Sequence, residues 1–197
     1  MQLSISGAIY LYLALLLSAC GSPKDLEKEN KLEVSCEISQ DASDNLDLID
    51  PFEWKSLEKE LDPFERKANH IQCIFGEGFF NESLGGVEVM AVKTETCNYI
   101  TLSQSSLKTI KKGDKVLFRF YYYDLVEPKG EKAYISVKIE DEFIWQKTYK
   151  IPSKSQLEKV TWTATKDFPA CSNIYFNVSN HGKNEYVFVE LSIFNEE

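Results

Sequence analysis

The stretch that decides the fold is KVLFRFYYY, residues 115–123. Its side chains alternate between two sides with a period of two, which is typical of a half-buried β-strand. One side is continuously apolar and is predicted to face a core: Val116, Phe118, Phe120 and Tyr122. The other side carries Arg119, Tyr121 and Tyr123. This stretch therefore predicts a sheet with one face packed inside the protein.

The same period recurs through the rest of the chain in short runs separated by Gly, Pro, Asn and Asp. The predicted strands are residues 71–75, 86–92, 98–102, 115–123, 133–140, 143–149, 157–164, 173–179 and 185–194. No long helical pattern lies between them to make parallel crossovers, so neighbouring strands should pair antiparallel. We expect an all-β domain over residues 71–197, folded as an antiparallel β-sandwich.

Alternation also predicts which side chains fill the core. Besides the four in 115–123, they are Ala133, Ile135, Val137, Ile139, Val160, Trp162, Ala164, Ile174, Phe176, Val178, Val187, Val189, Leu191 and Ile193.

A resemblance accompanies this pattern. The segment Lys112-Gly113-Asp114, followed by residues 115–121, resembles the lead into a strand in galactose-binding-like jelly rolls, the fold of many bacterial carbohydrate-binding modules. Residues 139–145 and 187–194 fit the same layout. The resemblance implies a jelly-roll sandwich that binds a ligand, without indicating binding residues one by one. The arrangement also resembles uncharacterised bacterial lipoproteins.

The outward-facing positions are richer in aromatic side chains than a purely solvated sheet requires. Aromatic rings beside guanidinium and amide groups suit a sugar, because the rings contact its C–H face and the polar groups bind its hydroxyls. The predicted ligand-binding residues are Arg119, Tyr121, Tyr123, Tyr175, Asn177 and Phe188. The alternative is that these rings form cross-strand pairs or lie beneath residues 52–68.

The N-terminus has the features of an export signal. Residues 1–19 carry no charged side chain and include the apolar run AIYLYLALLL at 8–17, which is too short to span a bilayer. Leu17-Ser18-Ala19-Cys20 resembles the lipobox of bacterial lipoproteins, which implies a signal peptide over 1–19 and lipidation at Cys20. By the same resemblance, Gly21 favours anchoring to the bacterial outer membrane. An ordinary secretory signal is the alternative, since no Lys or Arg precedes the apolar run.

The cysteines agree with export. Apart from Cys20 they form an even set, and exported chains oxidise, so we expect two disulfides. Three pairings are possible. We favour Cys97 with Cys171, because each precedes a predicted strand, which leaves Cys36 with Cys73.

Residues 20–70 differ from the predicted sandwich. Residues 20–50 are polar and acidic, as in a solvated tether. Within 51–70, Asp-Pro-Phe-Glu occurs at 50–53 and again at 62–65, which predicts two short helices with Asp as N-cap. Apolar residues at helical spacing would form one stripe, packed on the domain's own sheet or offered to a partner protein: Trp54, Leu57, Leu61, Phe64 and Ala68.

Charge and motifs limit the remaining functions. The net charge of −9 argues against nucleic acid as a partner. The chain has 2 histidines and carries no hydrolase, nucleotide-binding or metalloprotease motif, so we expect no enzyme and no cofactor. Glu77 and Glu190 are candidates for a structural calcium site of the kind that jelly rolls carry. The expected partners are a membrane, reached through the lipid anchor, and a saccharide or envelope protein.

Overall fold

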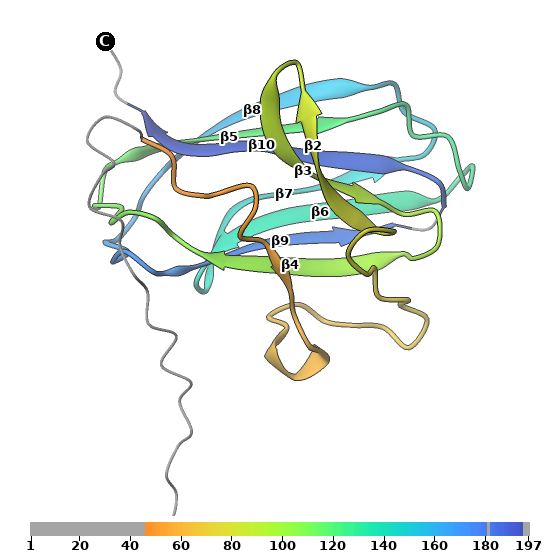
Figure 1. The fold of residues 1–197 in the computed structure, drawn as a ribbon, viewed down its shortest axis with the longest axis horizontal. Coiled ribbons are helices and arrows are strands. Elements are labelled where there is room, and N and C mark those ends of the chain that lie inside the picture. Colours follow the sequence, from red (N-terminus) through yellow and green to blue (C-terminus); the bar gives the residue numbers. More distant parts are fainter. Residues whose placement is uncertain (1–45, 181, 195–197) are drawn as a thin grey trace, which may run out of the picture. The chain divides into compact units, whose positions relative to one another are not determined.

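The computed structural model describes residues 46–180 and 182–194 and shows two five-stranded antiparallel sheets packed face to face (Figure 1). Sheet A has the order β2 (Phe79–Leu84), β3 (Val87–Lys93), β10 (Glu185–Phe194), β5 (Lys115–Tyr122), β8 (Gln156–Thr163). Sheet B has the order β1 (Lys55–Ser56), β4 (Tyr99–Ser105), β9 (Asn173–Ser179), β6 (Lys132–Ile139), β7 (Glu142–Lys150). The predicted all-β antiparallel sandwich is confirmed.

The connections follow the jelly-roll pattern. From β3 onward, successive strands alternate between the two sheets, except for the β6–β7 hairpin. The resulting orders β3-β10-β5-β8 and β4-β9-β6-β7 are those of an eight-stranded jelly roll, to which β1 and β2 add one edge strand each.

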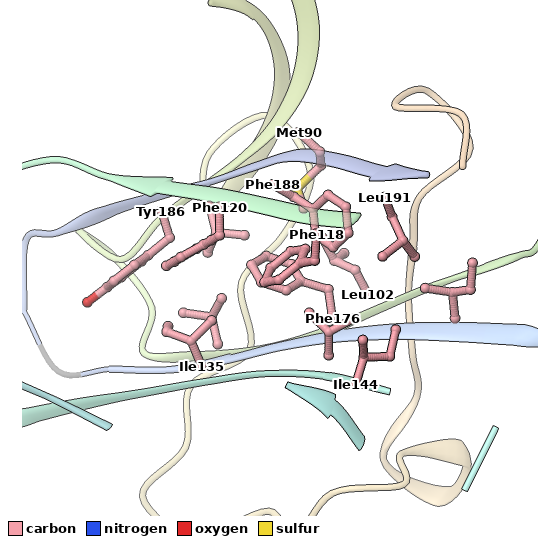
Figure 2. Close-up of a cluster of buried hydrophobic side chains, with 14 of the residues drawn as sticks. Met90, Leu102, Phe118, Phe120, Ile135, Ile144, Phe176, Tyr186, Phe188 and Leu191 are labelled. Carbon is pink, nitrogen blue, oxygen red and sulfur yellow. The ribbon is translucent and has the colours of Figure 1, made fainter. Parts of the chain in front are cut away.

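The core lies between the sheets and is rich in aromatic side chains (Figure 2). Phe118 and Phe120 of sheet A are fully buried, and the ring of Phe120 lies 6.1 Å from that of Phe176 of sheet B. Trp54 is also buried there, with its ring 5.0 Å from Phe188 and 6.4 Å from Phe176. Because these rings come from both sheets and from the preceding segment, they hold the three parts together.

Two predicted core residues face the other way. Val187 and Val189 of β10 belong to a separate cluster on the outer face of sheet A, whereas Tyr186 and Phe188 point into the core. The cause is a bulge in β10 between Phe188 and Glu190. A bulge inserts one extra residue and shifts the alternation, so inward positions before it cannot be extrapolated from those after it.

The prediction of two short helices in 51–70 is wrong. Asp50 and Asp62 do bind amides, but each accepts from the residue two positions later, Phe52 at 2.8 Å and Phe64 at 3.1 Å. This contact closes an Asx turn rather than a helix N-terminus. Within the described residues, the helical structure is one short 3₁₀ turn at Lys59–Leu61.

Residues 71–75 are not a strand, and the strand at β2 was not predicted. Gln72 and Phe75 make only isolated bridges, and a turn precedes β2. Of the predicted tether, residues 20–45 lie outside the described residues, as does the signal peptide at 1–19. The last part of the predicted tether belongs to the domain: Leu48 and Ile49 are buried, and the Leu48 amide donates to Leu191 O at 2.9 Å.

The predicted disulfide pairing is corrected: Cys97 bonds to Cys73, with Cα atoms 5.0 Å apart. Cys97 precedes β4 and Cys171 precedes β9, but these strands pair antiparallel, with Tyr99 opposite Ser179 and Ser105 opposite Asn173. The two cysteines therefore lie near opposite ends of the same strand pair, too far apart to bond. Cys171 is also disulfide-bonded, and Cys36 lies outside the described residues.

Across 46–180 and 182–194, no helix is long and apolar enough to cross a membrane.

Candidate functional site: the outer face of sheet A

Strand β5 turns the residues between its core positions outward. Phe118, Phe120 and Tyr122 are buried in the sandwich, so Arg119 and Tyr121 lie on the outer face of sheet A. Tyr123 follows the strand, with its ring 5.0 Å from that of Tyr121 in an edge-to-face arrangement. Three of the predicted ligand-binding residues are therefore brought together.

Tyr121 is part of an apolar row that crosses the whole sheet. The strand register places Tyr121 opposite Val187 of β10 and Leu157 of β8, and it places Val187 opposite Ala91 of β3. Ala91 in turn lies opposite Phe80 of β2. Since neighbouring strands are about 4.8 Å apart, these five side chains span about 19 Å at right angles to the strands.

The row is the centre of a second hydrophobic cluster, formed by side chains of the sheet's own strands. Val89, Ala91 and Val187 are fully buried. The half-buried side chains packed around them are Phe80, Leu84, Tyr121 and Val189. We refer to the Phe80, Ala91, Val187, Tyr121 and Leu157 side chains as the apolar row.

Charged side chains flank the row on one side. Arg119 lies opposite Glu190 of β10 and Lys159 of β8, and Arg119 and Glu190 form an ion pair. Ser192 Oγ donates to Glu190 at 2.6 Å. The bulge in β10 turns both Val189 and Glu190 outward, so that the carboxylate can hold the guanidinium beside Tyr121.

Carboxylates and a phenol flank the row near β2. Burial and the nearby Glu185 carboxylate raise the pKa of Glu82, and Lys93 partly opposes this. Burial, Glu82 and Glu185 raise the pKa of Tyr123. Within the described part of the chain, Glu82 Oε1 is buried without a hydrogen-bond partner. These groups are thus close enough to interact.

The two predicted calcium ligands, Glu77 and Glu190, have surroundings that differ from those of a metal site. Glu190 is paired with Arg119, and Glu77 is exposed in the turn before β2. The described residues contain no group of three or more His, Cys, Asp or Glu side chains placed to hold a metal ion.

Tyr175 and Asn177 lie on the opposite surface of the molecule. Both belong to β9, on the outer face of sheet B. Asn177 is buried, and its amide donates to Ile100 O at 3.1 Å and to Thr101 Oγ1 at 2.9 Å. Tyr175 is partly buried, and burial raises its pKa. Tyr175 and Asn177, two of the predicted ligand-binding residues, therefore do not share a surface with Tyr121.

Part of the outer face of sheet B is covered by residues 57–71, which we call the strap (Figure 1), whereas Gln146 and Thr148 of β7 are exposed on that face. The fully buried Asp62 carboxylate anchors it: Tyr99 Oη and Thr101 Oγ1 each donate to it at 2.9 Å, and Arg66 Nε does so at 2.6 Å. Farther along, the Phe64 ring lies 6.1 Å from that of Phe143 on β7. Tyr99, Thr101 and Asn177 of this face thus find partners within the protein, whereas the buried Ser136 Oγ has no hydrogen-bond partner among the described residues.

Phe188, the last predicted ligand-binding residue, is in the core, where its ring lies 5.1 Å from Phe176 and 5.2 Å from Phe118 (Figure 2). The sequence interpretation also missed Phe80, Glu82 and Ala91. The signal that could have found Phe80 and Glu82 is Gly85-Gly86 between two runs of period two, which is a hairpin pattern.

No family model and no curated protein matches the chain. Among solved structures, it is similar to the K2 cleaved adhesin domain of Lys-gingipain, with a TM-score of 0.43 and 13% identity over 79% of this chain and 95% of that one. It is also similar to the N-terminal cellulose-binding domain of Cellulomonas fimi β-1,4-glucanase C (TM-score 0.40, 14% identity, 62% and 92% covered). A third similar structure is a carbohydrate-binding module of family 28, specific for non-crystalline cellulose (TM-score 0.39, 17% identity, 59% and 80% covered).

Proposed function

We propose that this protein binds a saccharide, without catalysis, on the outer face of sheet A. The observation that carries the proposal is the apolar row, which crosses all five strands and has hydrogen-bonding side chains on both sides. An exposed apolar patch rimmed by polar residues marks a binding surface, and in this row Leu157 is exposed while Tyr121 and Phe80 are partly exposed.

A sugar chain matches this arrangement chemically. Its rings have apolar C–H faces, which aromatic and aliphatic side chains can contact, and hydroxyl groups around their edges. Arg119 can donate to those hydroxyls, and Glu82 and Glu190 can accept from them. Because Ala91 and Val187 are fully buried, the side chains of the row that sugar rings can contact are Phe80, Tyr121 and Leu157.

The competing proposal, a partner protein docked on an apolar stripe in 52–68, has less support. Trp54 is inside the sandwich, and Phe64 packs against Phe143 of sheet B. Leu61 is 69% exposed, but strand β1 lies between it and Trp54 and a bend lies between it and Phe64, so the three are not aligned on one helix.

The test is a pair of matched tyrosine substitutions, Tyr121→Ala on sheet A and Tyr175→Ala on sheet B. Both remove a partly buried ring from an outer face. Binding of cellohexaose, mannohexaose and chitohexaose is measured by isothermal titration calorimetry. For any sugar that the wild type binds, we expect Tyr121→Ala to weaken binding about fivefold or more, because the ring supplies about 1 kcal/mol or more of contact.

Tyr175→Ala should bind like the wild type. Equal losses in the two variants, or a loss in Tyr175→Ala alone, would contradict the assignment to sheet A. Failure of the wild type to bind any saccharide in a wider panel of envelope polysaccharides would contradict the proposed saccharide-binding function.

We also propose that the protein is held at a bacterial outer membrane by a lipid on Cys20. The support is the lipobox-like Leu17-Ser18-Ala19-Cys20 after an uncharged apolar run, all of it outside the described residues. Radiolabelled palmitate fed to cells expressing the full chain should label the wild type but not Cys20→Ser. Labelling of both, or of neither, would overturn the anchor without affecting the saccharide site.

A further inference from the structure

The two ends of the apolar row differ. At the β8 end, Leu157 is 52% exposed. At the β2 end, Phe80 is only partly exposed, and the neighbouring Val89 is fully buried. The row is therefore open toward β8 and more enclosed toward β2.

The enclosure comes from the β2–β3 hairpin, which leaves the sheet. β3 pairs with β10 only from Met90 to Lys93, although its pairing with β2 continues to Val87 opposite Leu84. Where β3 no longer pairs with β10, Asp47 lies beside β10 and forms an isolated bridge with Ser192. Figure 1 shows the hairpin rising steeply from sheet A on the side away from sheet B. A ligand lying along the apolar row meets this hairpin at one end.

A polar group suited to a chain end lies at the enclosed end. Glu82 is on the hairpin and is partly exposed, and its side chain shares the outer side of the hairpin with that of Phe80. A hydroxyl donor that reached the exposed part of this side chain would form a charge-assisted hydrogen bond with its carboxylate. The terminal unit of a saccharide carries a free hydroxyl where an interior unit carries a glycosidic bond, which has no proton to donate.

We propose that this face binds the end of a saccharide chain, with the terminal unit against the hairpin and Glu82 and with the rest of the chain leading out over Leu157. This inference rests on the saccharide-binding function proposed above. It adds a selectivity: short chains and chain ends are bound, and the interiors of long polymers are not.

The first test compares hexasaccharides with polymers of the same linkage: cellohexaose with hydroxyethyl cellulose, mannohexaose with galactomannan, and chitohexaose with glycol chitin. At equal sugar concentration, we expect the polymer to bind at least tenfold less than its hexasaccharide, because it has far fewer ends. Partial acid hydrolysis of the polymer should restore binding. Equal binding per sugar unit, or binding of the polymer alone, overturns end recognition but leaves saccharide binding intact.

The second test is Glu82→Gln, with Glu88→Gln as its control. Glu88 is exposed on the same hairpin, opposite Ser83 rather than beside Glu82. We expect Glu82→Gln to weaken hexasaccharide binding about fivefold or more, because a neutral acceptor forms a weaker hydrogen bond than a carboxylate. Glu88→Gln should have no effect. Unchanged binding in Glu82→Gln contradicts the proposal.

A third variant, in which residues 83–88 are replaced by a two-residue turn, should gain polymer binding while retaining that of the hexasaccharide. Its thermal unfolding is recorded first. If the shortened hairpin does not fold, the Glu82 and Glu88 pair still decides the question.

Discussion

The outer faces of the two sheets arise from the same alternation of side chains, but their surroundings in the folded protein differ. On sheet B, Thr101 and Asn177 are buried beneath the strap and hydrogen-bonded within the protein. On sheet A, Ala91 and Val187 of the apolar row are buried by side chains of the same sheet, whereas Leu157 is exposed and Tyr121 is partly exposed. The outer face of sheet B is thus held by hydrogen bonds to the strap, and the outer face of sheet A presents apolar side chains to solvent.

The largest expected effect is on the sheet B side, at the anchor of the strap. Asp62→Ala removes the acceptor of Tyr99, Thr101 and Arg66, and it leaves those donors without their partner in a buried site. We expect the free energy of unfolding to fall by about 3 kcal/mol, as measured by urea denaturation. Saccharide binding by the folded fraction should be unchanged.

Glu65→Ala, at an exposed position of the strap, is the matched control and should change stability by less than about 0.5 kcal/mol. An Asp62→Ala variant as stable as this control would mean that the strap is not held by its carboxylate.

A smaller effect is expected at Tyr99, as a pH dependence. Burial and the hydrogen bond to Asp62 raise the pKa of Tyr99 to about 12, although the hydrogen bond with Thr101 opposes the shift. Because the folded pKa is above that of an unfolded tyrosine, about 10, the stabilisation is complete below pH 10. It is lost as the pH rises from there toward 12.

Tyr99→Phe should therefore be less stable than the wild type at neutral pH by about 1–2 kcal/mol, and the difference should shrink between pH 10 and 12. Urea unfolding midpoints of both proteins across this range provide the measurement. A difference independent of pH would place the Tyr99 phenol outside the buried network.

The smallest effect on stability is expected at the ion pair on sheet A. Arg119 is 42% exposed in its side chain, so Arg119→Ala should lower the free energy of unfolding by less than about 1 kcal/mol. The same change should weaken saccharide binding severalfold, because it removes donors beside Tyr121. A variant with a large loss of stability and normal binding would reverse the roles assigned to the two faces.

The fold was largely predictable because β5, β6 and β9 alternate without interruption, and a period of two is a local property. The β10 bulge defeated the same reasoning, since one extra residue inverted the assignment of Val187 and Phe188. The predicted disulfide pairing was wrong for a different reason. Which ends of two strands meet depends on their pairing, and this places Cys97 near Cys73 rather than Cys171.

The candidate site was only partly predictable. Alternation identified Arg119 and Tyr121 as outward-facing, but a single strand does not show which sheet it joins. Alternation alone therefore could not separate Tyr175 from Tyr121, although β9 and β5 belong to different sheets. Phe80 and Ala91 could not be placed beside Tyr121, because their positions depend on the cross-strand register of four strand pairs.

The most direct test of binding on sheet A is a nuclear magnetic resonance titration of the ¹⁵N-labelled residues 21–197 with a hexasaccharide that the protein binds. Amide shifts should concentrate at Phe80, Ala91, Tyr121, Leu157 and Val187, which lie on five strands and are neighbours only on the outer face of sheet A. Shifts concentrated instead at Thr101, Ser136, Gln146 and Asn177, across sheet B, would contradict the account.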